Sequence, residues 1–424
     1  MRQAAAASPG DAGLAYALAQ ILLEAGLPAV REFETAVKLA PGRGDMRLGL
    51  AAARLAAGQG PQALTELGAT LAASPGWIEG HRQYAQLASL VGRHGDMLAT
   101  LERAIAAHPT VVELHQTAVQ LLLDAERFAD ARDAAQRGRR VADDDIALLL
   151  GEAAGSDELR DFAEARALFN RIGPSAERAI LVRRSRHFLR TGSHARAAAE
   201  LEPHLGPYGA DDLWPYAALA WRIGGDPRAT WLDEQPGLIS VTDLEFDEAA
   251  REALAGVLGA LHDRSGRFLD QSVRGGSQTD GALFARVDPE IVGLRERIRA
   301  AVAAHITGLP PPDPRHPTLA RRRDRPIRFA GSWSVRLRDA GFHAAHHHPQ
   351  GWLSSAFYVS VPQGEGGMLE LGGAPADFGL DLAPRRVVEP RVGRLVMFPS
   401  WMWHATRPFS RGERMTVAFD IART

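Results

Sequence analysis

Two patterns of apolar positions divide the chain. From Gly13 to about Ile223, apolar residues recur at spacings of three and four, alanine and leucine are abundant, and alternating β-branched runs are absent. This pattern is typical of α-helices with one buried face. After Gly224-Gly225-Asp226-Pro227 the helical period weakens and short alternating segments begin. We therefore predict two domains, an all-helical domain over residues 1–227 and a β-rich domain over residues 228–424.

Prolines recur every 34 residues in the first half, where Pro41, Pro75 and Pro109 each close an apolar helix. Thirty-four residues is the period of the tetratricopeptide repeat, a helix-turn-helix unit, and the chain has room for about six such units. Stacked repeats form a solenoid with an extended concave face, so a peptide or protein ligand is expected in the groove. The alternative is that the repeats are only a scaffold or a surface for forming a homodimer.

The second half predicts two helices and several short strands. The helices are Asp247–His262 and Pro289–Ile306, each with one apolar stripe. Gln271–Thr279, between them, is polar and rich in glycine and is expected to be a loop. The predicted strands are Trp333–Arg338, Ser354–Val361, Met368–Leu371, Arg394–Phe398 and Arg414–Ile421. Short strands at this density indicate a β-sandwich or jelly roll, with the helices packed against its outside.

Four of the 15 histidines fall within residues 343–348. In an extended chain, His346 and His348 point to one side while His347 points away. This is the spacing of metal ligands, and His404, in a second turn, is the candidate for a third. Three ligands on one face of a metal leave the opposite positions open for substrate and dioxygen, which is the layout of non-haem iron oxygenases.

Arg414 and Thr416 complete this group. In the last predicted strand they share one face with Asp420, while the other face is apolar and is expected to lie in the core. A guanidinium and a hydroxyl would therefore point into the barrel, beginning ten residues after His404. A buried guanidinium holds a carboxylate through two parallel hydrogen bonds, and the hydroxyl can add a third.

Composition narrows the chemistry and the partners. The chain has no cysteine, which excludes thiolate catalysis, disulfides and zinc ribbons. A net charge of -2 gives no broad basic surface, so neither nucleic acid nor a membrane is expected as a partner. No apolar run is long enough to span a membrane, and Met1–Leu23 is a poor signal peptide. A cytoplasmic protein is expected.

The ordered set of His-x-His, a distant His and Arg-x-Thr resembles the 2-oxoglutarate- and Fe(II)-dependent oxygenases, whose double-stranded β-helix carries His-x-Asp/Glu, His and Arg-x-Ser/Thr. More closely, the chain resembles a bacterial group of 2-oxoglutarate oxygenases that are often fused to tetratricopeptide repeats. The resemblance runs from about residue 231 to the end. Its motifs, besides His404 and Arg414, are Gln271–Thr279, Gly331-Ser332-Trp333-Ser334-Val335, His346-x-His348-Pro349-x-Gly351-Trp352, Ser354-Ser355-x-x-Tyr358 and Gly393-Arg394-Leu395-Val396-x-Phe398-Pro399-Ser400.

The resemblance implies a dioxygenase that uses Fe(II), 2-oxoglutarate and O2 to hydroxylate, or otherwise oxidise, a C–H bond. It implies no catalytic side chains beyond the metal and cosubstrate ligands. The iron ligands would be His346, His348 and His404. The distal carboxylate of 2-oxoglutarate would be held by Arg414 and Thr416.

Further contacts are expected around this centre. Tyr358 would add a hydrogen bond to 2-oxoglutarate, and Arg336, His343 and Trp352 are candidates for contacting the substrate. Because a solenoid that can bind peptides precedes the site, the expected substrate is a peptide or protein side chain. That step rests on the order of the domains alone.

His348 departs from the wider superfamily, which has a carboxylate at this position. Three neutral ligands leave the site one positive charge higher, which bears on the identity of the metal. His348 could instead lie outside the coordination sphere, or Glu370 or Asp381 could enter it. Two other functions stay open: a cupin-type dioxygenase with three histidines and no 2-oxoglutarate, and a non-catalytic repeat adaptor with a degenerate β-domain.

Overall fold

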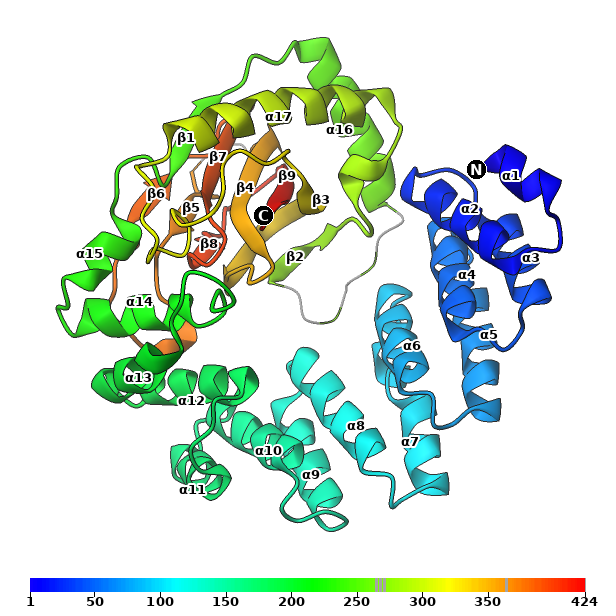
Figure 1. The fold of residues 1–424 in the computed structure, drawn as a ribbon, viewed down its shortest axis with the longest axis horizontal. Coiled ribbons are helices and arrows are strands. Elements are labelled where there is room, and N and C mark those ends of the chain that lie inside the picture. The colour runs from blue at the N-terminus through cyan, green and yellow to red at the C-terminus, as the bar shows by residue number, and fades with distance from the viewer. Residues whose placement is uncertain (264–265, 267–268, 270–271, 363–364, 424) are drawn as a thin grey trace. The chain divides into compact units, whose positions relative to one another are not determined.

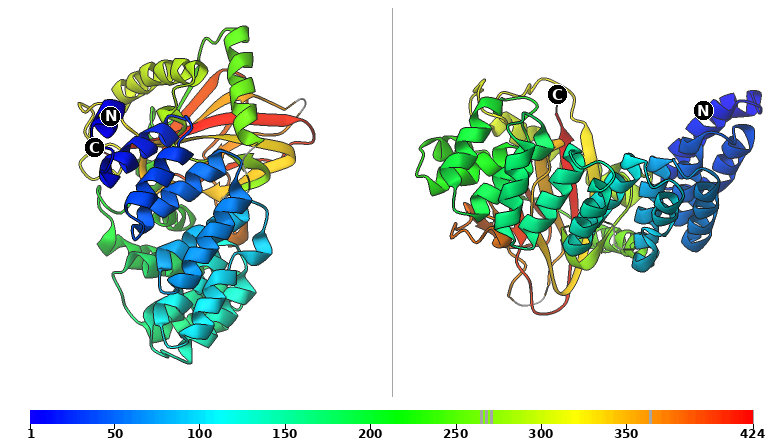
Figure 2. Two further views of the ribbon diagram at one scale, coloured as in Figure 1. Left: turned by 90° about the vertical axis from the view of Figure 1, so that its right-hand side faces the viewer. Right: turned by 90° about the horizontal axis from the view of Figure 1, so that it is seen from below.

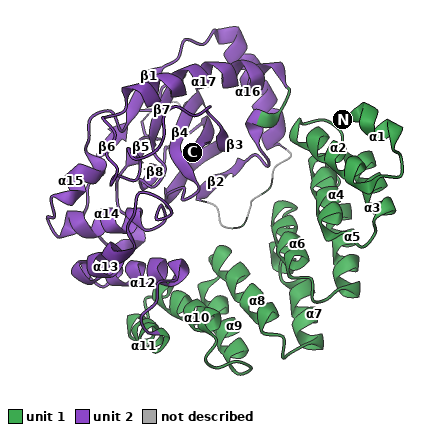
Figure 3. Ribbon diagram, viewed as in Figure 1, with its two compact units in different colours: residues 1–172, 264–271, 285–287 green, residues 173–263, 272–284, 288–424 purple. Residues whose placement is uncertain are grey.

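The computed structural model describes residues 1–263, 266, 269, 272–362 and 365–423 (Figure 1). The chain divides into two compact units (Figure 3). Unit 1 comprises residues 1–172, 264–271 and 285–287, and unit 2 comprises residues 173–263, 272–284 and 288–424. Each unit has cores of its own, so each is described separately.

Unit 1 is a series of antiparallel helix pairs. Its helices are α1 (Arg2–Ala7), α2 (Ala12–Glu24), α3 (Val30–Leu39), α4 (Gly44–Ala56), α5 (Gly60–Ala73), α6 (Ile78–Leu90), α7 (Ala99–Ala107), α8 (Val112–Asp124), α9 (Phe128–Arg139), α10 (Ile146–Glu158) and α11 (Phe162–Ile172), with the short 3-10 helix η1 (His94–Asp96). The residue two past the end of α4 and of α6 is Gly58 and Gly92, each with positive φ. Glycine reaches that conformation without steric cost, which turns the chain back for the next helix.

One side-chain contact repeats with the prolines of unit 1. Arg47 Nε donates to the carbonyl oxygen of Pro41 over 3.0 Å. His81 Nε2 lies 2.9 Å from the carbonyl oxygen of Pro75, and His115 Nε2 lies 2.9 Å from that of Pro109. In each repeat the donor stands six residues after the proline, so it satisfies a carbonyl left free where the preceding helix ends. The same side-chain hydrogen bond to a proline carbonyl therefore recurs every 34 residues.

Unit 2 begins with the helices α12 (Arg178–Arg190), α13 (His194–Leu201), α14 (Trp214–Ile223) and α15 (Arg228–Asp233), with η2 (Glu202–His204). The helix α14 is buried along most of its length, from Trp214 to Trp221. Its core continues into the β-rich part through Phe378 and Trp403. The boundary between the two compact units therefore lies before α12, whereas the chain changes from helices to strands only after α15. The predicted domain boundary after residue 227 stays a prediction.

The strands of the described residues form one antiparallel sheet that curls on itself. They are β1 (Ser240–Asp243), β2 (Val273–Gln278), β3 (Phe329–His346), β4 (Gly351–Ser360), β5 (Leu369–Leu371), β6 (Arg386–Val388), β7 (Arg394–Pro399), β8 (His404–Thr406) and β9 (Glu413–Ala422), and the 3-10 helices η3 (Leu283–Ala285) and η4 (Ala376–Phe378) lie between strands. Their order is β1-β7-β4-β9-β3-β8-β5-β6, with β2 on β3. The predicted double-stranded β-helix is confirmed.

The long strand β3 joins the two halves of the curled sheet. Its first part pairs with β9, from Phe329 to Arg338, whereas His343 and His346 pair with β8. Between these parts, Asp339 and Ala340 have positive φ. An irregularity of this kind bends a strand and increases its twist. The bend carries the end of β3 across to β8, where the histidines lie.

Two helices cover one side of the sheet (Figures 1 and 2), namely α16 (Glu248–His262) and α17 (Pro289–Gly308). Their apolar stripes, including Leu254, Leu258 and Ile298, pack with Phe357 of β4 and Phe419 of β9. Both helices were predicted, within two residues of these bounds. None of the helices in the described part of the chain is long and apolar enough to span a membrane.

The predicted loop over Gln271–Thr279 is wrong in its central part, because Val273–Gln278 forms β2. Gln271 lies outside the described residues. At Gly276 an added Cβ would lie 2.2 Å from the carbonyl oxygen of Arg336 in the neighbouring strand. The glycines therefore allow close approach of two strands rather than a turn, so their presence does not predict a loop here.

Candidate functional site

Strand pairing brings the three predicted histidine ligands together. His346, the last residue of β3, pairs directly with His404, the first residue of β8. His348 follows β3, and its backbone N–H donates to the carbonyl oxygen of Ser400 over 2.8 Å. The ring centroid of His346 lies 4.1 Å from that of His404 and 5.1 Å from that of His348. One ligand nitrogen from each histidine lies within 4.8 Å of the other two, so the group could hold a metal ion.

The hydrogen bonds of two of these histidines fix which nitrogen faces the centre. His346 Nδ1 lies 2.9 Å from the carbonyl oxygen of Ala344, and His404 Nδ1 lies 3.0 Å from that of Met402. A carbonyl oxygen only accepts, so Nδ1 carries the hydrogen and donates it, and Nε2 keeps its lone pair. Burial, followed by the neighbouring imidazoles, lowers the pKa of both rings well below the ordinary value. Both are therefore neutral near pH 7, the form that binds metal.

Arg414 is a buried cation that has no anionic partner among the described residues. Its side chain lies in β9 and is 2 % exposed. Among the described residues its Nε has no hydrogen-bond partner, and no carboxylate forms an ion pair with its guanidinium. The guanidinium lies over the ring of Tyr358, 4.8 Å from the ring centroid. Since buried charges in proteins are normally paired, this arrangement fits a site for an anionic ligand.

Tyr358 and Thr416 flank this guanidinium. They are paired across β4 and β9, and both side chains are buried. The hydroxyl of Tyr358 has no hydrogen-bond partner among the described residues. Buried hydroxyls are almost always hydrogen-bonded, so this hydroxyl beside the guanidinium is suited to donate to a ligand. Both orphaned groups match the acceptor oxygens of a carboxylate, and the residues present therefore fit 2-oxoglutarate.

Apolar side chains lie beside this polar group. Val335 and Leu337 of β3 pair with Thr416 and Arg414 of β9. Directly paired residues project from the same face of a sheet, so Val335 and Leu337 line the surface from which the guanidinium emerges. They form a small core cluster with Val273, Phe409 and Trp333. Low polarity around the guanidinium strengthens its interaction with any carboxylate.

Only one of the three predicted substrate contacts lies at the histidine group. His343 has its ring centroid 5.5 Å from that of His346, and burial, followed by Arg414, lowers its pKa to about 3. Its Nε2 is buried and has no partner among the described residues. The hydroxyl of Ser272 lies 3.4 Å from His343 Nδ1 and 3.3 Å from His346 Nε2. His343 and Ser272 thus border the candidate metal position.

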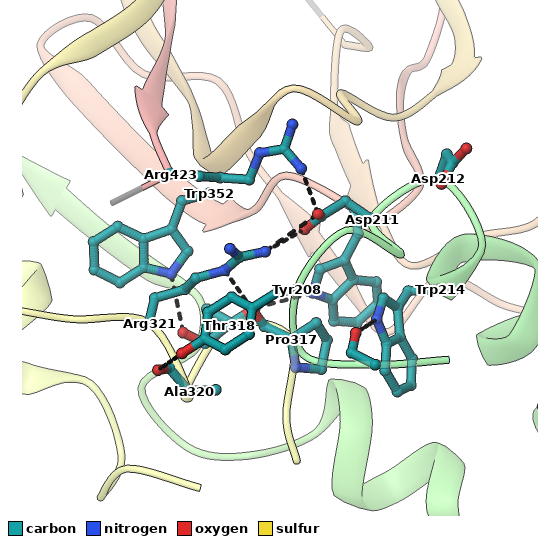
Figure 4. Close-up of polar contacts among 12 residues, drawn as sticks. Tyr208, Asp211, Asp212, Trp214, Pro317, Thr318, Ala320, Arg321, Trp352 and Arg423 are labelled. Carbon is teal, nitrogen blue, oxygen red and sulfur yellow. Dashed lines mark hydrogen bonds and ion pairs between the residues drawn. The ribbon is translucent and has the colours of Figure 1, made fainter. Parts of the chain in front are cut away.

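The structure does not bring Arg336 or Trp352 to this group. Arg336 pairs with Met415, whose side chain lies in the core under α17, and its guanidinium forms an ion pair with Asp263 over 2.8 Å. Trp352 is packed in the same core, and its Nε1 donates to the carbonyl oxygen of Thr318 over 3.0 Å (Figure 4). Both side chains therefore have structural partners on the helix-covered side of the sheet.

Of the two alternative carboxylate ligands, Glu370 pairs with Arg407, and neither Glu370 nor Asp381 belongs to the metal-binding group found among the described residues. Sequence reasoning missed a different carboxylate. Asp420 Oδ1 lies 2.8 Å from His348 Nδ1. The alternation of β9 had placed Asp420 on the same face as Arg414 and Thr416, but no contact with His348 was expected.

The sequence profile of the family described as "Putative 2OG-Fe(II) oxygenase" matches residues 331–420, a segment that contains the three histidines, Tyr358, Arg414 and Thr416. The comparison with curated proteins gave no match.

Solved structures with detectable similarity are of two kinds. A prolyl-4-hydroxylase from Pseudomonas putida is 16% identical, covering 44% of this chain and 93% of that chain with a TM-score of 0.31. HygX from Streptomyces hygroscopicus, with nickel and 2-oxoglutarate bound, is 13% identical, covering 44% and 83% with a TM-score of 0.31. A tetratricopeptide repeat protein from Parabacteroides merdae is 15% identical, covering 51% and 88% with a TM-score of 0.35.

The family match agrees with the fold and with the residues gathered in the curled sheet. It covers the segment that supplies the three imidazoles and the guanidinium of Arg414. Over residues 331–420 the β-domain of this chain is therefore similar to the 2OG-Fe(II) oxygenases, a family that uses Fe(II) and 2-oxoglutarate, and this domain follows an array of helix pairs.

Proposed function

We propose that the protein is a 2-oxoglutarate-dependent dioxygenase that hydroxylates a C–H bond, with His346, His348 and His404 as the iron ligands. One observation carries this proposal: three imidazoles converge on one point in the same curled sheet as a buried guanidinium that lacks an anionic partner among the described residues. A divalent cation matches the first group and a carboxylate matches the second. 2-Oxoglutarate is the ligand that requires both.

The side chains would then divide the work as follows. Arg414 and Thr416 would hold the distal carboxylate of 2-oxoglutarate, and the hydroxyl of Tyr358 would donate a hydrogen bond to the same molecule. The Nδ1–H groups of His346 and His404, bonded to backbone carbonyls, would keep each Nε2 directed at the metal. Bound Fe(II) and 2-oxoglutarate would supply the oxidising chemistry, in which 2-oxoglutarate is decarboxylated to succinate.

The proposed substrate is a peptide or protein side chain. The support is the repeat array, because stacked helix pairs provide an extended surface of the kind that binds peptides. His343 would face this substrate, since its ring lies beside that of His346 and its Nε2 has no partner among the described residues. A cytoplasmic location and a homodimer remain expectations from the sequence.

A second candidate is a three-histidine dioxygenase that acts without 2-oxoglutarate. The observation that favours it is the ligand set itself, because the metal-binding group among the described residues has no carboxylate. It provides no account of the unpaired guanidinium of Arg414.

The test is an anaerobic titration of the Fe(II)-loaded protein with 2-oxoglutarate, followed by the visible charge-transfer band of a chelated 2-oxo acid. We expect the band in the wild type, and a half-saturating 2-oxoglutarate concentration raised at least about tenfold in Arg414→Ala, as expected for the loss of a charged hydrogen bond worth roughly 1.5–3 kcal/mol. Arg338→Ala is the matched control, because this arginine also lies in the sheet but its side chain is 58% exposed.

The outcomes separate the candidates. Fe(II) binding without the band would favour the three-histidine dioxygenase and overturn the proposal. Unchanged iron content in the double variant His346→Ala, His404→Ala would rule out the iron site at these histidines. A wild-type protein that binds no iron would leave the repeat adaptor.

A further inference from the structure

Asp420 lies in β9 and is 7% exposed. Its Oδ1 accepts a hydrogen bond from the hydroxyl of Ser354 over 2.6 Å and lies 2.8 Å from His348 Nδ1. The hydroxyl of Ser354 also lies 2.9 Å from that of Ser400. The packing is tight, since a Cβ at Gly351 would come within 2.4 Å of the Ser400 hydroxyl oxygen and 3.1 Å of the Cβ of Asp420. The carboxylate is therefore held in one orientation, directed at His348.

The charge of this carboxylate is not balanced by an arginine or lysine in the described part of the chain. Among the residues that the structure describes, no arginine or lysine forms an ion pair with Asp420, and its only ionisable partner is His348. Asp211, another buried carboxylate of unit 2, shows the usual arrangement: it pairs with Arg321 over 3.0 Å and with Arg423 over 2.5 Å (Figure 4). A buried carboxylate without a counter-charge is costly, so a cation is expected nearby.

His348 differs from the other two histidines in what it contacts. His346 and His404 each donate from Nδ1 to a neutral backbone carbonyl, whereas Nδ1 of His348 faces a carboxylate. A carboxylate that accepts from Nδ1 fixes the imidazole with Nε2 as the free nitrogen and makes that nitrogen a stronger donor to a metal. Asp420 thereby places a negative charge one imidazole away from the metal position.

We propose that Asp420 is a positioning residue for the metal centre, acting through His348 and held by Ser354. The inference rests on the proposed function, because it takes His348 as a ligand. Sites with His-x-Asp carry a negative charge on the metal ligand itself. In this protein the histidine at that position is His348, and the negative charge is on Asp420, which contacts the Nδ1 side of His348. The three-histidine centre would therefore have a nearby negative charge although no carboxylate contacts the metal.

The first experiment measures the affinity for Co(II) alone, by competition with a chromophoric chelator, in Asp420→Asn. This change keeps the shape of the side chain and removes its charge. We expect binding weaker by about 10–100-fold, the usual effect of removing such a partner of a metal-bound histidine. Asp263→Asn is the matched control, because Asp263 pairs with Arg336 on the opposite face of the sheet. The control should bind Co(II) as the wild type does.

Ser354→Ala is the second variant and decides the question if Asp420→Asn does not fold. It keeps the charge of Asp420 and removes the hydroxyl that donates to Asp420 and lies 3.1 Å from His348 Nδ1, so we expect a loss of several-fold in Co(II) affinity. Wild-type affinity in Asp420→Asn would overturn the proposal, and so would wild-type affinity in Ser354→Ala if that variant has to decide. A wild-type protein that binds no Co(II) would contradict the proposed function, which is a different result.

Proton NMR of the Co(II)-loaded protein distinguishes positioning from a general structural role. Each Nδ1–H of a bound histidine should give an exchangeable resonance shifted by the metal. In Asp420→Asn we expect the resonance of His348 to move while those of His346 and His404 stay in place. Equal movement of all three would show a general distortion of the sheet and overturn the specific role.

Discussion

Tyr358 has a buried hydroxyl that no described residue satisfies. Leaving such a group unpaired costs free energy, so Tyr358→Phe should leave the unfolding free energy of the ligand-free protein unchanged or slightly higher. If 2-oxoglutarate supplies the partner, the same change should weaken 2-oxoglutarate binding to the Fe(II) protein by about 2- to 12-fold, corresponding to roughly 0.5–1.5 kcal/mol. Urea unfolding and the anaerobic titration measure the two quantities.

Tyr208→Phe is the matched control for this prediction. Its hydroxyl donates to the carbonyl oxygen of Ala320 over 2.9 Å, and the residue is exposed (Figure 4). The control should not change 2-oxoglutarate affinity. Equal affinity in Tyr358→Phe and the wild type would show that the hydroxyl does not contact the cosubstrate.

The alternation of side chains along a strand correctly predicted which residues of β9 face the site, but it did not predict which residues of the neighbouring strand surround them. In β9 the apolar face is the core face, as expected from the sequence, so Arg414 and Thr416 were placed on the correct side. In β3 the rule fails, because Val335 and Leu337 line the site while Ser334 and Arg336 face the helices. The polar side chains of Ser334 and Arg336 have partners that cannot be predicted from the sequence pattern. For example, His262 Nε2 lies 2.9 Å from the Ser334 hydroxyl.

At the scale of elements, a substitution of His81 tests whether the hydrogen bond that recurs with the repeats stabilises the helices. The ring is 1% exposed, with Nε2 against the carbonyl oxygen of Pro75 and Nδ1 against the hydroxyl of Thr100, both at 2.9 Å. His81→Ala would leave a cavity and two unpartnered groups. We expect the unfolding free energy to fall by about 2–4 kcal/mol, measured by urea unfolding. The exposed His108 is the control, and His108→Ala should change it by less than about 0.5 kcal/mol.

The same residue gives the sign of a pH effect. Burial lowers the pKa of His81 below its ordinary value of 6.5. As the pH falls below 6.5 the unfolded chain therefore takes up a proton that the folded chain refuses, and the folded state loses stability. His81→Ala should depend less on pH in this range than the wild type does. An equal pH dependence would mean that His81 is not held neutral by the fold.

Elements were predicted unevenly for a physical reason. Apolar positions repeat with one period in the helices α16 and α17 and in the strands β4, β7 and β9. Such segments can be predicted from their own sequence alone. Short strands such as β6 and β8 are held by pairing with distant residues, as β8 is by His343 and His346 of β3. Pairing between residues far apart in sequence leaves no local pattern, so β1, β2, β6 and β8 were not predicted.

For the whole molecule, the division into two compact units predicts which strands and helices are stabilised when the metal and 2-oxoglutarate bind. Every proposed contact of metal and 2-oxoglutarate lies in unit 2. Adding Mn(II) and 2-oxoglutarate should slow hydrogen exchange in β3, β4, β8 and β9, because binding to the folded form suppresses opening of the strands that hold the ligand. Exchange in residues 1–172 should stay unchanged.

The double variant His346→Ala, His404→Ala is the control, and its exchange should not respond to the two ligands. Slower exchange within α2–α11 of the wild type would contradict the prediction and would show that the repeats respond to the chemistry of the β-domain.

Strand β9 carries a buried carboxylate at Asp420 and a buried guanidinium at Arg414, and neither has a counter-charge among the described residues. Six residues of extended chain, about 20 Å, keep the two from neutralising each other. A newly made chain that folds without its ligands would therefore retain both costs, and the cell would degrade more of it. Iron supply and 2-oxoglutarate supply would then set how much of this protein a cell keeps, as well as how fast each copy works.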